Sequence, residues 1–448
     1  MSNDWGDMTE GKSPKLTLVG SVALGTGVMI GAGIFALVGQ VAEIAGGYLP
    51  WAFLAGAIVV GFSAYSYIRY SATNPSSGGI AMLLKAAYGP GVIAGSFSLF
   101  MYVSMVLAES LLGRTFGTYF LRLFGMQDSA VWVPVLAVVA IASAAAVNLF
   151  GNRWVERSAT ITAAVKILGI ALLAVAGIIA AGSSALGQLL TTSQESSLAM
   201  GWLGVPAGTA LCILAYKGFT TITNQGADLR DPKRNIARSI IIAISLCTVL
   251  YLLITVAVTS SLSVQEITEA RDYALAEASE PLFGHWGVLI TVVIAVVATL
   301  SGLIASLFSV SRLYDMLREM GQAPGLPFGK NHQSLILTAL LAIVMAAFFD
   351  LSQIASLGAI LYLSMDIAIH WGIIRHLKDE VNAKIWIPGV AIILDLIVLV
   401  PFALVKLQTN LLTIVVTAAV AGAIIALQWI AVRRRQNAPT EKSSKRDD

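Results

Sequence analysis

Charged residues are scarce in this sequence. Asp, Glu, Lys and Arg make up 12% of its 448 residues, about half of the roughly 25% that is usual in soluble domains. There are only two cysteines, Cys212 and Cys247, and both lie in apolar runs, which predicts neither a disulfide framework nor a cysteine metal site. A Walker-type phosphate loop, His/Cys metal spacing and a nucleophile–base pair are also missing. We therefore expect no enzymatic activity, no metal site and no cofactor.

Hydrophobic residues dominate instead. They make up 57% of the chain, and the mean hydropathy is +0.81. Apolar runs of ~20 residues recur, which is the length that crosses ~30 Å of hydrocarbon, and they do not alternate as barrel strands do. The sequence therefore predicts an all-α integral membrane protein. The twelve expected spans cover residues 16–41, 49–70, 91–123, 131–149, 158–181, 202–224, 237–260, 286–316, 334–349, 354–374, 385–405 and 411–432.

The distribution of charge predicts the orientation. Basic residues gather in alternate connecting segments and in the 433–448 tail, whereas the 263–284 loop is acidic. By the positive-inside rule, both termini lie in the cytoplasm and the chain is a multi-pass protein of the inner (plasma) membrane. The basic tail is interpreted as a juxtamembrane topology signal rather than a nucleic-acid site, so we expect no nucleic-acid partner. The polar, acidic 1–15 segment is unlike a cleavable signal peptide, which predicts that the first span is retained.

Two spans carry glycine interruptions. Span 1 contains GTGVMIGAGIF (residues 25–35), and span 6 contains AYKGFT (residues 215–220). Glycines weaken a helix by about 1 kcal/mol each relative to alanine, and close helix packing is the alternative explanation for Gly27 and Gly31. Interrupted helices at corresponding positions of two five-helix halves indicate an inverted-repeat transporter site. Their broken ends would present N–H groups to an anion and carbonyls to a cation, and an amino acid carries both charges.

These residues resemble a known family. GTGVMIGAGIF, PSSGG (residues 75–79), AYKGFTTITNQGADLRDPKRNIARSI (residues 215–240) and the end of span 8 are similar to the amino acid–polyamine–organocation (APC) superfamily. The resemblance covers about residues 15–375. It implies a LeuT-like five-plus-five fold and alternating access without ATP. The implied segments are an N-tail (1–15), a first repeat (16–181), a second repeat (202–374), two extra helices (385–432) and a C-tail (433–448).

The resemblance also implies the substrate site. Its carboxylate-binding backbone falls on Gly31, Ala32 and Gly33, and its ammonium-binding carbonyls fall near Met29 and on Tyr216 to Lys217. The aromatic gate maps to Tyr216 or Phe219. The full set of expected substrate-binding residues is Met29, Ile30, Gly31, Ala32, Gly33, Tyr216, Lys217, Gly218 and Phe219. Family members mostly place an apolar or acidic residue where Lys217 stands, which predicts an altered pocket.

Charges within the spans are functional candidates because a charge in the bilayer is costly. Lys166 lies in span 5, where the resemblance implies proton coupling in place of a sodium ion. Burial favours the neutral form of a lysine, so Lys166 could switch its protonation state. The alternative is a fixed ammonium that tethers spans 1, 5 and 8. The expected coupling ion is the proton, with sodium as the alternative.

Other polar residues are weaker candidates. Lys217 could contact an acidic group of the substrate, pair with Glu109 on span 3, or reach a water-filled vestibule. Ser306 on span 8 could lend its hydroxyl to Lys166 or to a sodium ion, with ordinary helix packing as the alternative. Asp366 and His370 lie one turn apart on span 10 and are interpreted as a packed polar pair, with a proton relay as the alternative; Asp395 is interpreted as structural.

The sequence therefore predicts a secondary active transporter of an amino-acid-like small solute in the lipid bilayer, with proton-coupled symport favoured. The first alternative is an exchanger without net proton transport. The second is a membrane sensor or scaffold that does not transport. The sequence does not specify the substrate or the oligomeric state.

Overall fold

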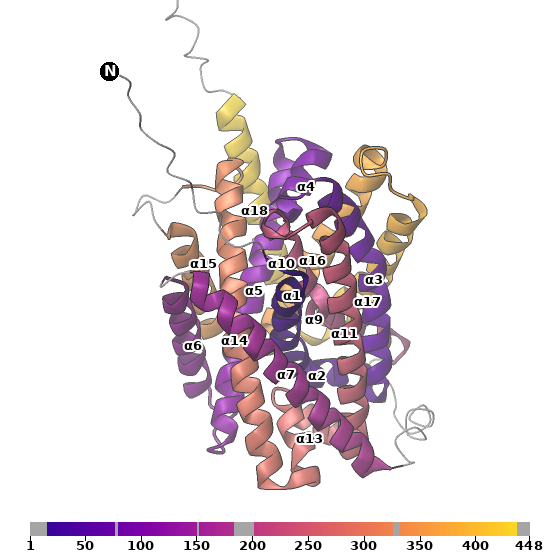
Figure 1. Cartoon of the computed structure of the whole chain (residues 1–448), viewed down its shortest axis with the longest axis vertical. Coiled ribbons are helices and arrows are strands. Elements are labelled where there is room, and N and C mark those ends of the chain that lie inside the picture. The colour runs from indigo at the N-terminus through magenta and orange to yellow at the C-terminus, as the bar shows by residue number, and fades with distance from the viewer. Residues whose placement is uncertain (1–15, 77–78, 150–151, 183–200, 326–331, 437–448) are drawn as a thin grey trace, which may run out of the picture.

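The computed structural model describes residues 16–76, 79–149, 152–182, 201–325 and 332–436. Within these ranges the chain is helical, apart from connecting turns and an isolated parallel bridge between Leu16 and Leu229. The long helices lie alongside one another in a bundle (Figure 1). The predicted all-helical membrane architecture is confirmed.

The helices before residue 183 cover the first five predicted spans. They are α1 (Leu18–Ala32), α2 (Ile34–Ala45), η1 (Gly46–Tyr48), α3 (Leu49–Thr73), α4 (Gly79–Tyr88), α5 (Val92–Arg122), α6 (Trp132–Leu149) and α7 (Asn152–Ala181).

The helices after residue 200 cover the remaining seven predicted spans and begin with the second interrupted one. They are η2 (Gly201–Leu203), α9 (Gly204–Tyr216), η3 (Lys217–Phe219), α10 (Thr220–Thr223), η4 (Gly226–Asp228), α11 (Pro232–Ser261), α12 (Val264–Glu269), α13 (Ala274–Phe283), α14 (His285–Glu319), α15 (Gln333–Phe348), α16 (Leu351–Gly372), η5 (Ile373–Leu377), α17 (Trp386–Thr409) and α18 (Leu411–Gln436).

Ten helical stretches among the described residues are long and apolar enough to cross a membrane. Three shorter apolar helices accompany them: Leu18–Gly31, Gly79–Tyr88 and Gln333–Phe348. The first and third correspond to predicted spans 1 and 9. The second is α4, which the sequence did not predict; its ten residues rise about 15 Å, half the hydrocarbon thickness.

Local sequence signals explain several helix ends. The Thr17 side chain accepts a hydrogen bond from the Gly20 N–H at 3.1 Å and caps α1. Asp350 and Gln353 form a reciprocal capping box at the start of α16. Proline occupies the first turn of α11, where its missing N–H costs nothing.

The α1 helix lies at the centre of the bundle, and α7 crosses obliquely in front of it (Figure 1). α1 also contacts α14 and α11, while α17 and α18 lie outside it and contact α16 and each other. The 263–284 segment, expected as a polar loop, contains α12 and α13. Both helices pack against α2, so this segment covers the end of the bundle that lies farthest from Leu16 along α1 and α2.

Candidate functional site

Two helices are interrupted inside the bundle at the positions that their glycines predicted. α1 gives way to α2 at Gly33, and the three-residue turn η3 separates α9 from α10. The interruption at Gly33 is slight, since its backbone stays near helical values (φ −78°, ψ −67°) and its N–H donates to the Met29 carbonyl at 2.7 Å.

The two interruptions meet through Gly218. A Cβ atom built on Gly218 would lie 2.7 Å from the Met29 backbone nitrogen and 3.1 Å from the Gly25 carbonyl oxygen. A Cβ built on Gly25 would in turn lie 2.7 Å from Cδ1 of Ile222 on α10. Only glycine allows such close backbone contact. Gly25 and Gly218 therefore allow the two interrupted helices to lie in close contact.

The predicted carboxylate-binding segment is largely enclosed in this conformation. Gly31 faces away from η3, because its Cβ would meet the Ala298 carbonyl oxygen of α14 at 2.9 Å. Met29 and Ile30 are fully buried. The side chain of Ala32 lies outside the described part of the structure.

The two aromatic residues of span 6 point toward α3 and α11. The Tyr216 hydroxyl donates to the Phe53 carbonyl at 3.4 Å, and its ring lies 5.0 Å from the Tyr251 ring. Phe219 packs edge-to-face on Tyr67, with ring centroids 5.2 Å apart. Because both side chains are fully buried, either would have to move for the predicted gate to open.

Lys217 points in another direction, toward α5 and α16. Its ammonium donates to the carbonyl and to the hydroxyl oxygen of Ser104, both at 2.7 Å. The Ser104 hydroxyl in turn donates a hydrogen bond to the Gly358 carbonyl at 2.8 Å. The ammonium also lies 5.6 Å from the Tyr362 ring centroid, a cation–π distance. Lys217 is 4% exposed, so the interpretation as a vestibule lysine is wrong for this conformation.

Glu109 is buried without a formed partner. Neither carboxylate oxygen has a hydrogen-bond partner among the described residues, and Lys217 is not within 4.0 Å of either. The Lys217–Glu109 ion pair that the sequence suggested is therefore wrong here, because the Lys217 ammonium donates its hydrogen bonds to Ser104 instead. The two charges still interact electrostatically, and the Ser306 hydroxyl lies near the carboxylate outside hydrogen-bond geometry. A buried unpaired carboxylate is costly, which marks this place for a proton or a cationic group.

Lys166 connects α7 to α1 in the way that the sequence predicted for a tether. Its ammonium donates to the Gly27 carbonyl at 3.1 Å, and the side chain is 1% exposed. Gly27 lies two residues before Met29, so this hydrogen bond acts on the interrupted helix itself. The hydrogen bond joins spans 5 and 1, two of the three spans that the tether alternative connects.

One end of α1 is tied down by what we call the α1 latch, formed by Leu16, Asp228, Arg230 and Arg312. Leu16 donates to the Asp228 carbonyl at 2.9 Å and accepts from the Arg230 N–H at 3.0 Å. Arg312 on α14 forms an ion pair with the Asp228 carboxylate at 2.7 Å. The latch joins the start of α1, the segment after α10 and the end of α14.

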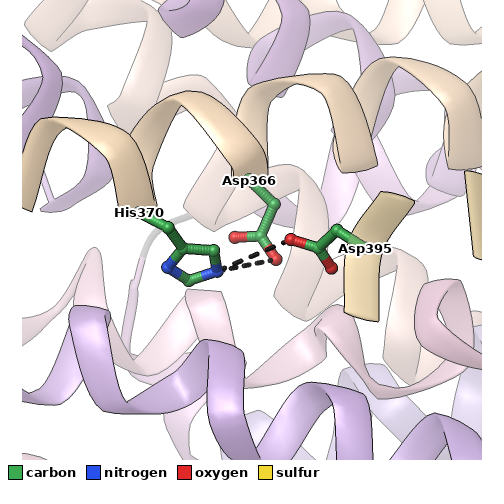
Figure 2. Close-up of side chains that lie close together, drawn as sticks. All are labelled: Asp366, His370 and Asp395. Atoms are coloured by element: carbon green, nitrogen blue, oxygen red, sulfur yellow. Dashed lines mark ion pairs between the residues drawn. The ribbon is translucent and has the colours of Figure 1, made fainter. Parts of the chain in front are cut away.

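Asp366 and His370 share one face of α16, as predicted, with 3.5 Å between Asp366 Oδ2 and His370 Nε2. Figure 2 shows Asp395 of α17 pointing at the same imidazole. The sequence treated Asp395 as a separate structural residue, because periodicity relates positions only within one helix. Ser104 and Tyr362 were also missed, since a serine or tyrosine in an apolar span carries no distinguishing signal.

Comparisons with known proteins agree with this architecture. The family model described as amino acid permease matches residues 16–438. Inner membrane transport protein YbaT of Escherichia coli is 29% identical over 403 residues, which cover 88% of this chain and 91% of that protein. The methylthioribose transporter of Bacillus subtilis is 25% identical and covers 83% of each chain. Vacuolar cationic amino acid transporter 2 of Arabidopsis thaliana is 27% identical, over 82% of this chain and 60% of that protein.

Solved structures extend the likeness of fold. A mutant of the Eremococcus coleocola manganese transporter superposes with a TM-score of 0.60 at 14% identity, over 94% of this chain and 95% of that one. At this identity the likeness concerns the fold alone. Together with the match over most of the chain, it confirms the resemblance seen in the glycine motifs: this chain belongs to the amino acid permease family and is a membrane transporter.

Proposed function

We propose that this protein is a secondary active transporter of an amino acid or a similar small solute, working by alternating access. The observation that carries the proposal is the backbone contact of Gly218 with Met29 and Gly25, which brings the two interrupted helices together inside the bundle. Interrupted helices of this kind form substrate sites in transporters, because their free N–H and carbonyl groups complement a charged solute.

In this proposal the substrate lies between residues 29–33 and 216–219. The carboxylate would be held by backbone N–H groups near Gly33, and the ammonium by carbonyls near Met29 and Tyr216. Since the Gly33 N–H donates to Met29 at 2.7 Å here, substrate binding requires the interruption to open further. The structure thus corresponds to a closed form of the site.

Lys217 and Glu109 set the charge preference of the site. Lys217 would attract an acidic group of the substrate and repel a dication such as a polyamine. Its two hydrogen bonds to Ser104 of α5 hold the ammonium in place inside the bundle. Glu109 offsets this preference because its carboxylate interacts with the same ammonium. A neutral or acidic amino-acid-like solute is the substrate class that fits this arrangement.

Lys166 is the residue through which we propose proton coupling. A charge-assisted hydrogen bond is about twice as strong as a neutral one. A protonated Lys166 therefore holds the Gly27 carbonyl, and with it α1, more firmly than a neutral amine does. Loss of the proton would loosen α1 and favour movement of the interrupted helix. Sodium is the alternative coupling ion.

The proposal includes the arrangement expected from the sequence. Residues 16–181 and 202–374 would form two inverted repeats. Movement of one repeat against the other would open the site alternately to the two sides of the membrane. The basic connecting segments support cytoplasmic termini and a location in the plasma membrane.

Two other functions make different predictions. An exchanger without net proton transport would show saturable counterflow that ignores the pH gradient. A sensor or scaffold would bind solute without any flux. Two relatives, a cationic amino acid transporter and a methylthioribose transporter, favour transport.

The test is uptake of labelled amino acids into proteoliposomes by the wild type and the Lys166→Ala variant. We expect saturable uptake by the wild type and loss of gradient-driven uptake in the variant, with counterflow retained. Binding without flux in the wild type would contradict the proposal. Equal gradient-driven uptake by both proteins would remove Lys166 from the coupling mechanism.

A further inference from the structure

A second group of buried polar residues lies apart from the interrupted helices, where α16 meets α17. Asp366, His370 and Asp395 are all 0% exposed. His370 Nε2 lies 3.5 Å from Asp366 Oδ2 and 3.7 Å from Asp395 Oδ2 (Figure 2). One ligand atom from each residue can be chosen so that all three lie within 4.8 Å of one another. Three groups that can bind a metal ion therefore converge on one small volume.

The surrounding hydrogen bonds orient two of the three groups. Ser63 and Tyr67 of α3 donate to the two oxygens of Asp366. The Ser66 hydroxyl lies 2.8 Å from Nδ1 of His370. In the tautomer whose Nδ1–H donates a hydrogen bond to the Ser66 hydroxyl oxygen, the lone pair of Nε2 points at the two carboxylates. Metal-bound histidines are oriented in this way by a hydrogen bond to the other ring nitrogen.

Two of the three groups in the cluster have atoms without hydrogen-bond partners. Both oxygens of Asp395 and Nε2 of His370 are buried and make no hydrogen bond among the described residues. The Nε2–oxygen distances of 3.5 and 3.7 Å exceed the 2.7–3.2 Å of a direct hydrogen bond. A buried carboxylate without compensation is costly, so a cation between these atoms would remove a large penalty.

The distances match a metal site better than a shared proton. Zinc binds histidine nitrogen and carboxylate oxygen at about 2.0–2.2 Å in tetrahedral geometry, which places two ligand atoms about 3.4 Å apart. The observed 3.5 and 3.7 Å lie close to this value. The charge also balances, because two carboxylates and a neutral imidazole neutralise one divalent cation, as a low-dielectric interior requires.

We propose that Asp366, His370 and Asp395 form a binding site for a divalent transition metal ion of the zinc class, which holds α17 against α16. The sequence predicted no metal site, because Asp395 is 25 residues from His370 along the chain. The site is separate from the proposed substrate site but is connected to it through Tyr67, which donates to Asp366 and packs on Phe219 of η3. Three protein ligands leave one coordination position for a water molecule or another group.

The experiment uses the purified full-length protein, freed of its affinity tag and treated with a chelator. Titration with ZnCl₂ should give one bound ion per chain and raise the midpoint of thermal unfolding. His370→Gln and Asp395→Asn should each weaken zinc binding at least about tenfold. His376→Gln is the matched control, because His376 lies on η5 and contacts the Ala87 carbonyl instead, and it should bind zinc as the wild type does.

A second measurement does not depend on variants that fold. Co²⁺ added to the chelator-treated wild type should produce the visible absorption bands of tetrahedral cobalt, and Zn²⁺ should abolish them. Ser66→Ala, which removes only the orienting hydrogen bond, should weaken zinc binding about tenfold. The proposal is overturned if the wild type binds no stoichiometric zinc or cobalt, or if His370→Gln and His376→Gln bind it equally. If no metal binds, a proton shared among Asp366, His370 and Asp395 would be the cation that neutralises the carboxylates.

Discussion

The substitution Gly218→Ala tests whether the two interrupted helices must lie in close backbone contact. It adds one methyl group to η3 at the place where η3 touches α1. The added carbon would lie 2.7 Å from the Met29 nitrogen, 2.8 Å from Met29 Cγ and 3.1 Å from the Gly25 carbonyl oxygen. The Met29 side chain can move, but two of the three atoms belong to backbone, so α1 and η3 must separate.

The size of the effect follows from these distances. Ordinary contact begins near 3.4 Å, so the 2.7 Å contact requires a separation of 3.4 − 2.7, or about 0.7 Å. Overpacking of this kind costs about 1–3 kcal/mol. At 1.4 kcal/mol for each factor of ten, the closed form loses about 5- to 100-fold in population. In the proposed alternating-access cycle, transport passes through this form, so we expect uptake to fall by a similar factor.

The assay compares initial uptake rates in proteoliposomes at equal amounts of reconstituted protein. Gly61→Ala is the matched control, because nothing lies within 4 Å of a Cβ at Gly61 on α3. It should transport like the wild type and be up to about 1 kcal/mol more stable, as alanine favours a helix over glycine. Wild-type uptake by Gly218→Ala would refute the reasoning that close backbone contact is required.

Three further predictions concern charges. A Lys217→Glu/Glu109→Lys double variant should transport no better than Lys217→Glu alone in the uptake assay, because the ammonium bonds Ser104 and not Glu109. Asp228→Ala breaks a half-exposed ion pair of the α1 latch worth up to about 1 kcal/mol. It should therefore speed modification of a Ser21→Cys thiol about fivefold. Asp272→Asn should flatten the fall of thermal stability with rising pH, because burial destabilises the ionised Asp272 carboxylate, which asparagine cannot form.

The sign of the Asp272 effect is fixed by its environment. Burial raises the pKa of Asp272 above its usual 3.8, even though Arg271 lowers it. The folded protein thus favours the protonated carboxyl, and this stabilisation is complete below about 3.8 and lost as the pH rises through the folded value. Asparagine keeps an oxygen for Gln40, which now donates to Asp272, but cannot ionise.

Each of these predictions has a contradicting outcome. Full recovery of uptake in the charge-swap variant would show that Lys217 and Glu109 act as a pair. An unchanged modification rate of the Ser21→Cys thiol would show that the α1 latch does not hold α1. A pH dependence of unfolding that is the same with and without the Asp272 carboxyl would place its cause elsewhere.

The sequence predicted the features that depend on local chemistry. Apolar runs marked the long helices, and the glycines at 31, 33 and 218 marked the two interruptions, because glycine weakens a helix wherever it stands. Lys166 was recognised because a charge within a span is costly in any fold. Its contact with the Gly27 carbonyl then followed from the neighbouring position of spans 1 and 5.

Features that depend on packing between distant segments were not predictable. The direction of Lys217 depends on the rotation of η3, which decides whether Ser104 or Glu109 receives the ammonium. Asp395 joins Asp366 and His370 only because α17 packs on α16. The helix α4 was missed because it is too short for a span and its apolar residues face the bundle.

The central claim is that the protein transports an amino-acid-like solute with protons, through α1 and η3. The most direct measurement is uptake of a labelled amino-acid mixture into proteoliposomes in sodium-free buffer, with and without an inward proton gradient. We expect saturable uptake that rises with the gradient in the wild type. In the Lys166→Ala variant, uptake should no longer depend on the gradient. Uptake that ignores the gradient, or that appears only when solute is loaded inside, would contradict proton coupling and identify an exchanger.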